Sequence, residues 1–110
     1  MDYYIGRSVA YTRLKQPADA LRDSETAVVL ALDRGDRGKR AAAQFRRAIA
    51  LHQLGKHADA KVCLDLALEA DYAGKDAALW KPRIESAAAK SEPPEFRLSW
   101  AMTLTGRPSR

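Results

Sequence analysis

A forty-residue internal repeat is the feature that most constrains how this chain can fold. The stretch "KQPADALRDSETA" is followed, forty positions later, by "GKHADAKVCLDLA". The residues that are identical at this spacing are Arg7/Arg47, Ala10/Ala50, Leu14/Leu54, Ala18/Ala58, Asp19/Asp59, Ala20/Ala60 and Ala27/Ala67. A fixed period of this length is typical of folds in which one supersecondary unit is duplicated and stacked. The repeat therefore predicts two copies of one unit.

Within each copy, apolar residues recur at the spacing of an α-helix. Alanine dominates the apolar residues and stands beside Leu, Arg, Lys and Asp, a composition that favours helix. The spacing predicts helices over residues 2–15, 17–33, 40–54 and 57–70. The stretch "RGDRGK" between the second and third helices contains two glycines that oppose helix continuation, and we expect it to be a solvated connector, with a frayed helical extension as the alternative. The chain is thus predicted to be all-α, built from antiparallel helix pairs.

The segment after residue 75 contains further helix-forming residues but also a proline. Pro82 removes one helical hydrogen bond and clashes with the preceding turn if it lies inside a helix. Two arrangements follow: a turn through Trp80 with a helix beginning near Pro82, or one kinked helix. We expect a helical domain over residues 1–90, with a capping helix at about 76–90, and an irregular tail over residues 91–110.

Composition and charge restrict the class of protein. With 110 residues, of which 46% are apolar and 30% charged, the chain is expected to form one globular domain. No stretch approaches the ~20 apolar residues of a membrane-spanning helix, and "MDYYIGRSVAY" lacks the features of a secretory signal. The single Cys63 excludes an internal disulfide and favours a reducing compartment, so we expect the cytoplasm or the nucleus.

The net charge of +5 raises the question of nucleic-acid binding. The basic residues are spread along the chain, and the densest stretch, "DRGDRGKR", is interrupted by two acidic residues and two glycines. No recognised nucleic-acid-binding motif accompanies it. We therefore keep a basic nucleic-acid-binding protein only as the weakest alternative.

Small residues recur where the two helices of each pair are expected to cross: Ser8 and Ala20 in the first copy, Ala48 and Ala60 in the second. This pattern resembles the tetratricopeptide repeat, over residues 3–34 and 41–74. Ser24 stands where that repeat usually has a larger apolar residue, and Leu32 replaces its usual proline. The period of forty exceeds the usual ~34 residues. The six extra residues must therefore lengthen a helix or form a loop.

Two longer phrases, "YYIGRSVAYTRLKQPADALRDSETAV" and "AQFRRAIALHQLGKHADA", resemble the amino-terminal repeats of one co-chaperone family, suppressor of G-two allele of Skp-one, in its fungal form. The resemblance implies a non-catalytic protein-interaction module of a co-chaperone or adaptor. Its partners would belong to chaperone–client, ubiquitin-ligase or kinetochore assembly. In that family a further repeat precedes the equivalent of Tyr3. We therefore expect Tyr3, Tyr4 and Ile5 to form an exposed leading face that can pair with a second copy.

In stacked helix pairs, the first helix of each pair lines the concave side. The residues expected to line this partner-binding groove are Ile5, Val9, Thr12, Arg13, Phe45, Arg46, Ile49, His52 and Gln53. Arg13 and Arg46 are expected to bind carboxylates of the partner. Many co-chaperones grip acidic chaperone tails through a five-residue carboxylate clamp, of which only Arg46 remains here, because Gly6 and Ala42 occupy clamp positions. We predict no binding of such tails.

The chain lacks the residue patterns of an enzyme. His52 and His57 are separated by a turn at Gly55, so they do not share a helix face as a zinc-binding pair would. Cys63 lies between Val62 and Leu64 and is expected to pack in the core. No phosphate-binding glycine loop occurs. We therefore expect no catalysis, no metal and no cofactor, and we keep a structural homo-oligomerisation unit, such as a homodimer, as the main alternative to an adaptor.

Overall fold

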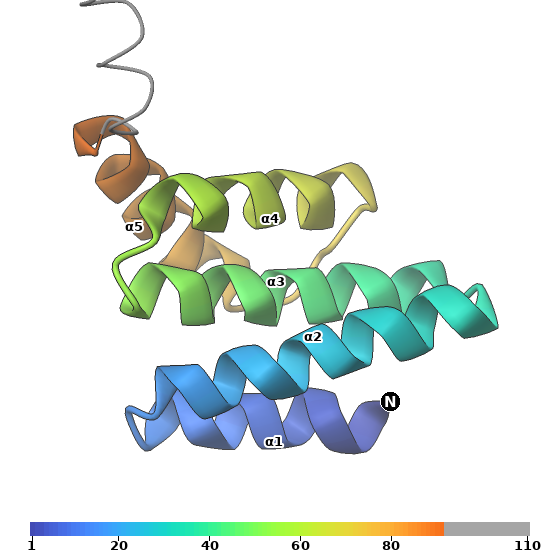
Figure 1. Ribbon diagram of the computed structural model, residues 1–110. Helices are drawn as coiled ribbons and strands as arrows, with labels where there is room; N and C mark the ends of the chain where they lie inside the picture. The colour runs from blue at the N-terminus through green and yellow to red at the C-terminus, as the bar shows by residue number, and fades with distance from the viewer. Residues whose placement is uncertain (92–110) are drawn as a thin grey trace, which may run out of the picture.

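The computed structural model describes residues 1–91, which form five α-helices and contain no β-strand (Figure 1). The helices are α1 (Asp2–Arg13), α2 (Pro17–Arg34), α3 (Arg37–Gln53), α4 (His57–Glu69) and α5 (Ala77–Lys90). The all-α prediction is therefore confirmed for this part of the chain. The predicted irregular tail lies outside the described residues except for Ser91.

The helices α1 to α4 run in alternating directions, and each packs against the next (Figure 1). In addition, α1 contacts α3, and α3 contacts α5. The central helix is therefore α3, which touches all four of the others. By contrast, α2 and α4 lie on either side of α3 without contacting one another within residues 1–91. This separation matters for the surface described below.

The turn inside each helix pair has the same geometry in both copies. Lys15 has a positive φ of 59°, and Gly55, forty residues later, has a φ of 82°. In the first copy, the amide of Gln16 donates to the carbonyl of Tyr11 at 2.9 Å; in the second, that of Lys56 donates to Leu51 at 2.9 Å. Such 6→1 bonds are typical of a helix that ends on a left-handed residue. The sequence repeat is thus also a repeat of local backbone structure.

The connector predicted between the second and third helices is almost entirely helical. Only Gly35 and Asp36 separate α2 from α3. Gly35 ends α2 in the left-handed conformation, with φ 65°, and the Oδ1 of Asp36 accepts a hydrogen bond from the amide of Lys39 at 3.0 Å. A left-handed glycine followed at once by an N-capping aspartate closes one helix and opens the next. The prediction of a solvated connector over residues 34–39 is therefore wrong.

This junction explains the long period of the repeat. The helices that meet there, α2 and α3, have 18 and 17 residues, whereas α1 and α4 have 12 and 13. Of the two possibilities for the six extra residues, the structure therefore has longer helices instead of a loop. The residues "RGDRGK" become part of two helix ends.

Pro82 lies inside α5, which runs without interruption from Ala77 to Lys90. The prediction of a helix that begins near Pro82 is therefore wrong, and the alternative of a single helix is confirmed. The missing N–H of Pro82 leaves the carbonyl of Ala78 without its usual helical donor. Because Ala78 and Pro82 are both exposed, water can take the place of that donor.

The core lies mainly between α3, α4 and α5. Its buried members are Phe45, Ala48, Ile49, Leu51, Ala60, Cys63, Leu64, Ala67 and Ile84. The ring of Phe45 stacks on that of Tyr72, with centroids 4.4 Å apart. A smaller cluster of Ala27, Val28 and Ala43 joins α2 to α3, and Tyr4 and Ile5 of α1 pack against it.

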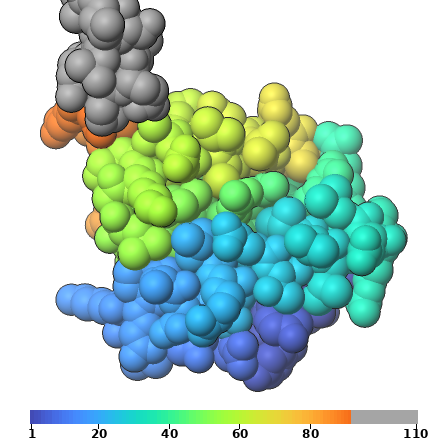
Figure 2. Space-filling view, in the orientation of Figure 1, coloured from blue at the N-terminus to red at the C-terminus, as the bar shows by residue number. Residues whose placement is uncertain are grey.

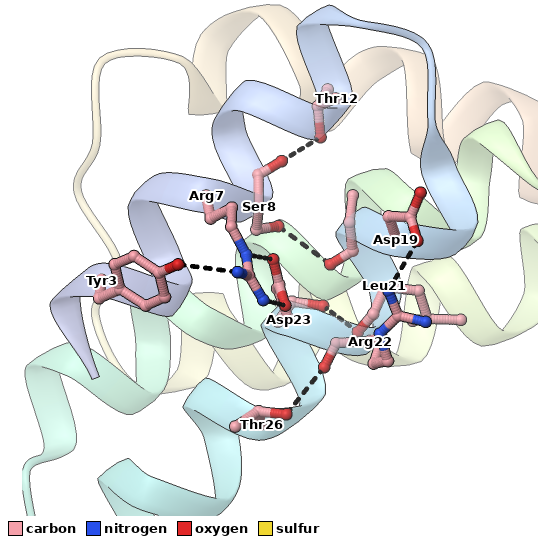
Figure 3. A network of polar contacts seen from close by, with 11 residues as sticks. Tyr3, Arg7, Ser8, Thr12, Asp19, Leu21, Arg22, Asp23 and Thr26 are labelled. Atoms are coloured by element: carbon pink, nitrogen blue, oxygen red, sulfur yellow. Dashed lines mark hydrogen bonds and ion pairs between the residues drawn. The ribbon is translucent and has the colours of Figure 1, made fainter.

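The small residues predicted at helix crossings are buried. Ser8, Ala20, Ala48 and Ala60 are all fully inaccessible. The hydroxyl of Ser8 on α1 donates a hydrogen bond to the carbonyl oxygen of Ala20 on α2, at 3.1 Å (Figure 3). Contact between a side chain and the facing backbone requires the two helices to approach closely, which larger side chains would prevent. The predicted burial of all four positions is confirmed, and the hydrogen bond from Ser8 to Ala20 shows close approach of the helices in the first copy.

A partly buried ion pair joins α1 to α2 beside this crossing (Figure 3). The guanidinium of Arg7 donates to both carboxylate oxygens of Asp23, at 2.6 Å and 2.9 Å, and to the hydroxyl of Tyr3 at 2.8 Å. Asp23 is only 2% exposed, and the hydrogen bonds from Arg7 hold the pKa of its carboxyl group below the ordinary value. In the second copy Cys63 replaces Asp23, so this pair belongs to the first copy alone.

Candidate protein-binding groove

A groove lies between α2 and α4, and α3 forms its floor. Figure 2 shows this face, on which the surface of α3 is recessed between those of α2 and α4. The groove has two hollows: one of about 350 Å³, to which α2 contributes Leu32, and one of about 260 Å³, which is lined by α3 and α4 alone. Leu66 of α4 lines both of them, so the two hollows adjoin. We call this surface the α2–α4 groove.

The floor of the α2–α4 groove is a single stripe of α3. The stripe consists of Arg37, Arg40, Gln44, Arg47 and Leu51. Their spacing of three, four, three and four residues places them on one side of a helix. Two arginines, Arg37 and Arg40, lie at the amino-terminal end of the stripe, whereas its carboxyl-terminal end consists of Arg47 and the buried Leu51.

Exposed aliphatic side chains form the walls. Leu32 of α2 is 53% exposed, and Val62 and Leu66 of α4 are 58% and 42% exposed. Val29, one turn before Leu32, is also exposed. Single exposed aliphatic residues are ordinary on protein surfaces, but a group that surrounds one depression is typical of an interaction site.

At the amino-terminal end of the groove floor, arginine side chains outnumber carboxylates. Arg37 donates from Nη2 to the backbone carbonyl of Glu69 at 2.9 Å, and Arg47 lies 3.5 Å from a carboxylate oxygen of Glu25. Arg40 has no ion-pair partner among residues 1–91. Two guanidinium groups, Arg37 and Arg40, therefore stand beside one carboxylate, Glu69, at the amino-terminal end of the floor.

The groove contains one thiol, that of Cys63. Cys63 lines the smaller hollow but is buried, and burial raises the pKa of its thiol, so the thiol stays protonated at neutral pH. Within the described chain, no three His, Cys, Asp or Glu residues are placed to hold a metal ion. None of the five helices is long and apolar enough to span a membrane.

The structure corrects the concave groove predicted from the sequence at Phe45, Ile49 and Arg46. Phe45 and Ile49, expected to line it, are fully buried in the core, so their assignment to an open groove is wrong. Arg46 forms an ion pair with Asp76 of α5 at 2.6 Å, and its guanidinium lies over the ring of Phe45. The group expected to grip a partner's carboxylate thus holds α3 to α5 instead.

The remaining residues of that predicted groove lie around its edges. Ile5 and Val9 are half-buried on α1, and the hydroxyl of Thr12 donates to the carbonyl of Ser8 at 2.9 Å. Arg13 and Gln53 are exposed at the ends of α1 and α3. Partner binding by these five residues stays a prediction.

His52 lies in an aromatic cluster at the carboxyl end of α3. Its ring centroid is 5.2 Å from that of His57 on α4 and 6.1 Å from that of Trp80 on α5. Burial lowers the pKa of His52, and the nearby His57 and Arg83 lower it further. His52 therefore belongs to the junction of three helices, where its neutral form is favoured.

Of the predicted leading face, only one residue is prominently exposed. Tyr3 is 63% exposed, whereas Tyr4 and Ile5 turn inward and pack against the cluster of α2 and α3 residues. The expected exposure is therefore wrong for Tyr4 and Ile5. Pairing of this face with a second copy stays a prediction.

Sequence reasoning missed the floor of the α2–α4 groove. Arg37, Arg40, Gln44 and Arg47 have helical spacing that is visible in the sequence, but Arg37 lies in the predicted connector and Arg40 is the first residue of the predicted helix. Because α3 begins at Arg37, the four residues lie on one side of a single helix and form one stripe. The sequence matches no known family model, and no characterised protein or solved structure is significantly similar to the chain.

Proposed function

We propose that the chain is a non-catalytic protein-interaction module built as a stack of two tetratricopeptide-type helix pairs. The pairs are α1 with α2 and α3 with α4, and α5 covers the end of the second pair. Three observations support this architecture: the forty-residue repeat, the matching turns at Lys15 and Gly55, and the buried alanines at positions 20 and 60.

The observation that carries the proposed function is the α2–α4 groove. Its walls hold Leu32, Val62 and Leu66 exposed, and Arg40 on its floor has no ion-pair partner within residues 1–91. Exposed aliphatic side chains gain free energy when a partner removes them from water, at roughly 25 cal/mol per Å². Arginine is also enriched at protein interfaces. Both features favour a protein as the partner.

By the resemblance described above, we propose the role of a co-chaperone or adaptor in the cytoplasm or the nucleus. The partners would then be components of chaperone–client, ubiquitin-ligase or kinetochore assemblies. The absence of four of the five clamp residues argues against acidic chaperone tails as partners, because each charge-assisted donor contributes about 1.5–3 kcal/mol.

Affinity capture with the full chain, followed by binding measurements with each captured protein in purified form, tests this function. We expect at least one protein to bind the chain with a Kd of about 10 µM or tighter. Nuclease treatment is expected to leave the complex intact. If every captured protein fails to bind once purified, or if nuclease abolishes capture, the adaptor function is contradicted. A steep fall in duplex-DNA affinity with salt would instead indicate the nucleic-acid alternative.

The exposed side of α1 favours a second candidate, a structural unit that pairs with itself. Tyr3 and Leu14 are 63% and 64% exposed, and Ala10 between them is exposed as well. Their spacing of seven and four residues places them along one side of the helix. Light scattering over a range of concentrations tests this candidate, because a dimer's mass depends on concentration and a monomer's does not.

A further inference from the structure

We propose that the occupant of the α2–α4 groove is an amphipathic helix of a partner protein, with acidic residues at one end and aliphatic residues at the other. The inference rests on the proposed function, because it names the chemistry of the partner at the same surface. It depends on the shape of the groove, the order of charges along its floor and the aliphatic walls.

The shape of the groove suits a helix. Its floor from Arg40 to Leu51 is twelve residues of α3, roughly 16 Å at the helical rise, or about three turns. The wall formed by α4 lines both hollows and is itself a helix, so its side-chain rows can interdigitate with those of a bound helix, and Leu32 of α2 stands opposite it at the larger hollow. Residues 1–91 contain no strand edge that an extended peptide could join. Helix-in-groove recognition is therefore favoured over strand addition.

The order of side chains along the groove sets the polarity of the partner. At the amino-terminal end of α3, Arg37 and Arg40 face one carboxylate, Glu69. At the other end, the lining consists of Leu51, Val62 and Leu66 together with Cys63 and one charge of each sign, Arg47 and Asp59. A complementary helix carries Asp or Glu over Arg40, where forked hydrogen bonds to a carboxylate are available. Its aliphatic residues then lie against Val62 and Leu66.

The same lining disfavours the other occupants. A nucleic-acid backbone would meet the carboxylates of Glu69 and Asp59 and the aliphatic side chains of Leu32 and Leu66, none of which complements phosphate. A second copy of this chain that docked through its exposed α1 side would bring Arg13, which lies beside that side, to the arginines of the groove. Like charges placed opposite each other oppose association.

Selection from a displayed library of helix-forming peptides of about 14 residues, with random residues on one face, tests the proposal with the full chain as bait. We expect the enriched peptides to combine aliphatic residues at helical spacing with Asp or Glu near one end. Methyl NMR spectra of the chain with a selected peptide are expected to show shifts at Leu32, Val62 and Leu66.

Two pairs of matched variants locate the binding site. Arg40→Glu and Leu66→Glu change the groove, whereas Arg83→Glu and Leu79→Glu make the same changes on exposed residues of α5. We expect each groove variant to weaken peptide binding about tenfold or more, and each α5 variant to change it by less than about twofold. Circular dichroism and thermal melting of all four variants show whether any loss of binding comes from unfolding.

The outcomes separate this inference from the proposed function. If acidic peptides bind the Arg40→Glu and Leu66→Glu variants more weakly, and both variants remain folded, the result supports both the proposed function and the inference. If the selected peptides bind elsewhere, or are neutral or basic, the inference is overturned, whereas the proposed function as a protein-interaction module is not. The inference is also overturned if duplex DNA binds in the groove, or if light scattering shows a dimer in which a second copy of the chain covers the groove. Failure to enrich any peptide, together with failure of affinity capture, overturns both.

Discussion

Replacing Ala20 by leucine tests the close helix crossing on which the fold depends. Ala20 is fully buried, and its carbonyl oxygen lies 3.1 Å from the hydroxyl of Ser8 on the facing helix. Leucine adds three carbon atoms where α1 and α2 leave no free space, so the helices must move apart. Overpacking of this kind costs about 1–3 kcal/mol. A chain of this size has a total stability of about 5–15 kcal/mol, so the loss is a substantial part of it.

Ala18→Leu is the matched control, because Ala18 lies in the first turn of the same helix and is exposed. Alanine and leucine differ in helix propensity by only a few tenths of a kcal/mol. One kcal/mol shifts the melting temperature of a domain of this size by about 4–8 °C. We therefore expect Ala20→Leu to melt about 5–15 °C below Ala18→Leu when both are followed by circular dichroism.

The second copy of the repeat allows the same comparison at an independent site. Ala60 is fully buried and Ala58 is exposed, as their counterparts are in the first copy. Ala60→Leu is therefore expected to melt below Ala58→Leu by a similar amount. If the buried and exposed variants melt within about 1 °C of each other in both copies, alanine is not required at the crossings and our explanation of the repeat is incorrect.

Four further predictions concern single groups. Lys15→Gly should raise the free energy of unfolding in urea by about 0.5–1 kcal/mol, because glycine adopts a positive φ without strain; a lower value would contradict this. Asp36→Ala should lower it by about 1 kcal/mol through loss of the cap on α3, and an unchanged urea midpoint would refute the cap. Because the pKa of His52 is lowered from 6.5 in the folded protein, the unfolded chain binds more protons, and stability should fall as pH drops below about 6.5; His52→Gln should reduce this dependence, which urea midpoints at several pH values measure. Cys63, buried and with a raised thiol pKa, should react with a thiol reagent far more slowly in the folded chain than in urea, and equal rates would show that it is accessible.

The candidate site shows where prediction from sequence fails. Phe45 and Ile49 were placed correctly on a common side of their helix, but that side is covered by α4 and α5 instead of facing a partner. Helical periodicity identifies which residues share a face, but it does not state which neighbour covers that face. In the same way, Arg46 could be recognised as polar, whereas its pairing with Asp76 depends on where α5 packs.

The sequence by itself determined the helical class, the two matching turns and the burial of Ala20 and Ala60. These features depend on residues close together in the chain, or on a repeat that can be compared with itself. The tertiary structure alone decided that α2 and α4 stand apart on either side of α3 and leave a groove above Arg40. A groove is a property of the space between helices, and that space depends on how all the buried side chains pack together.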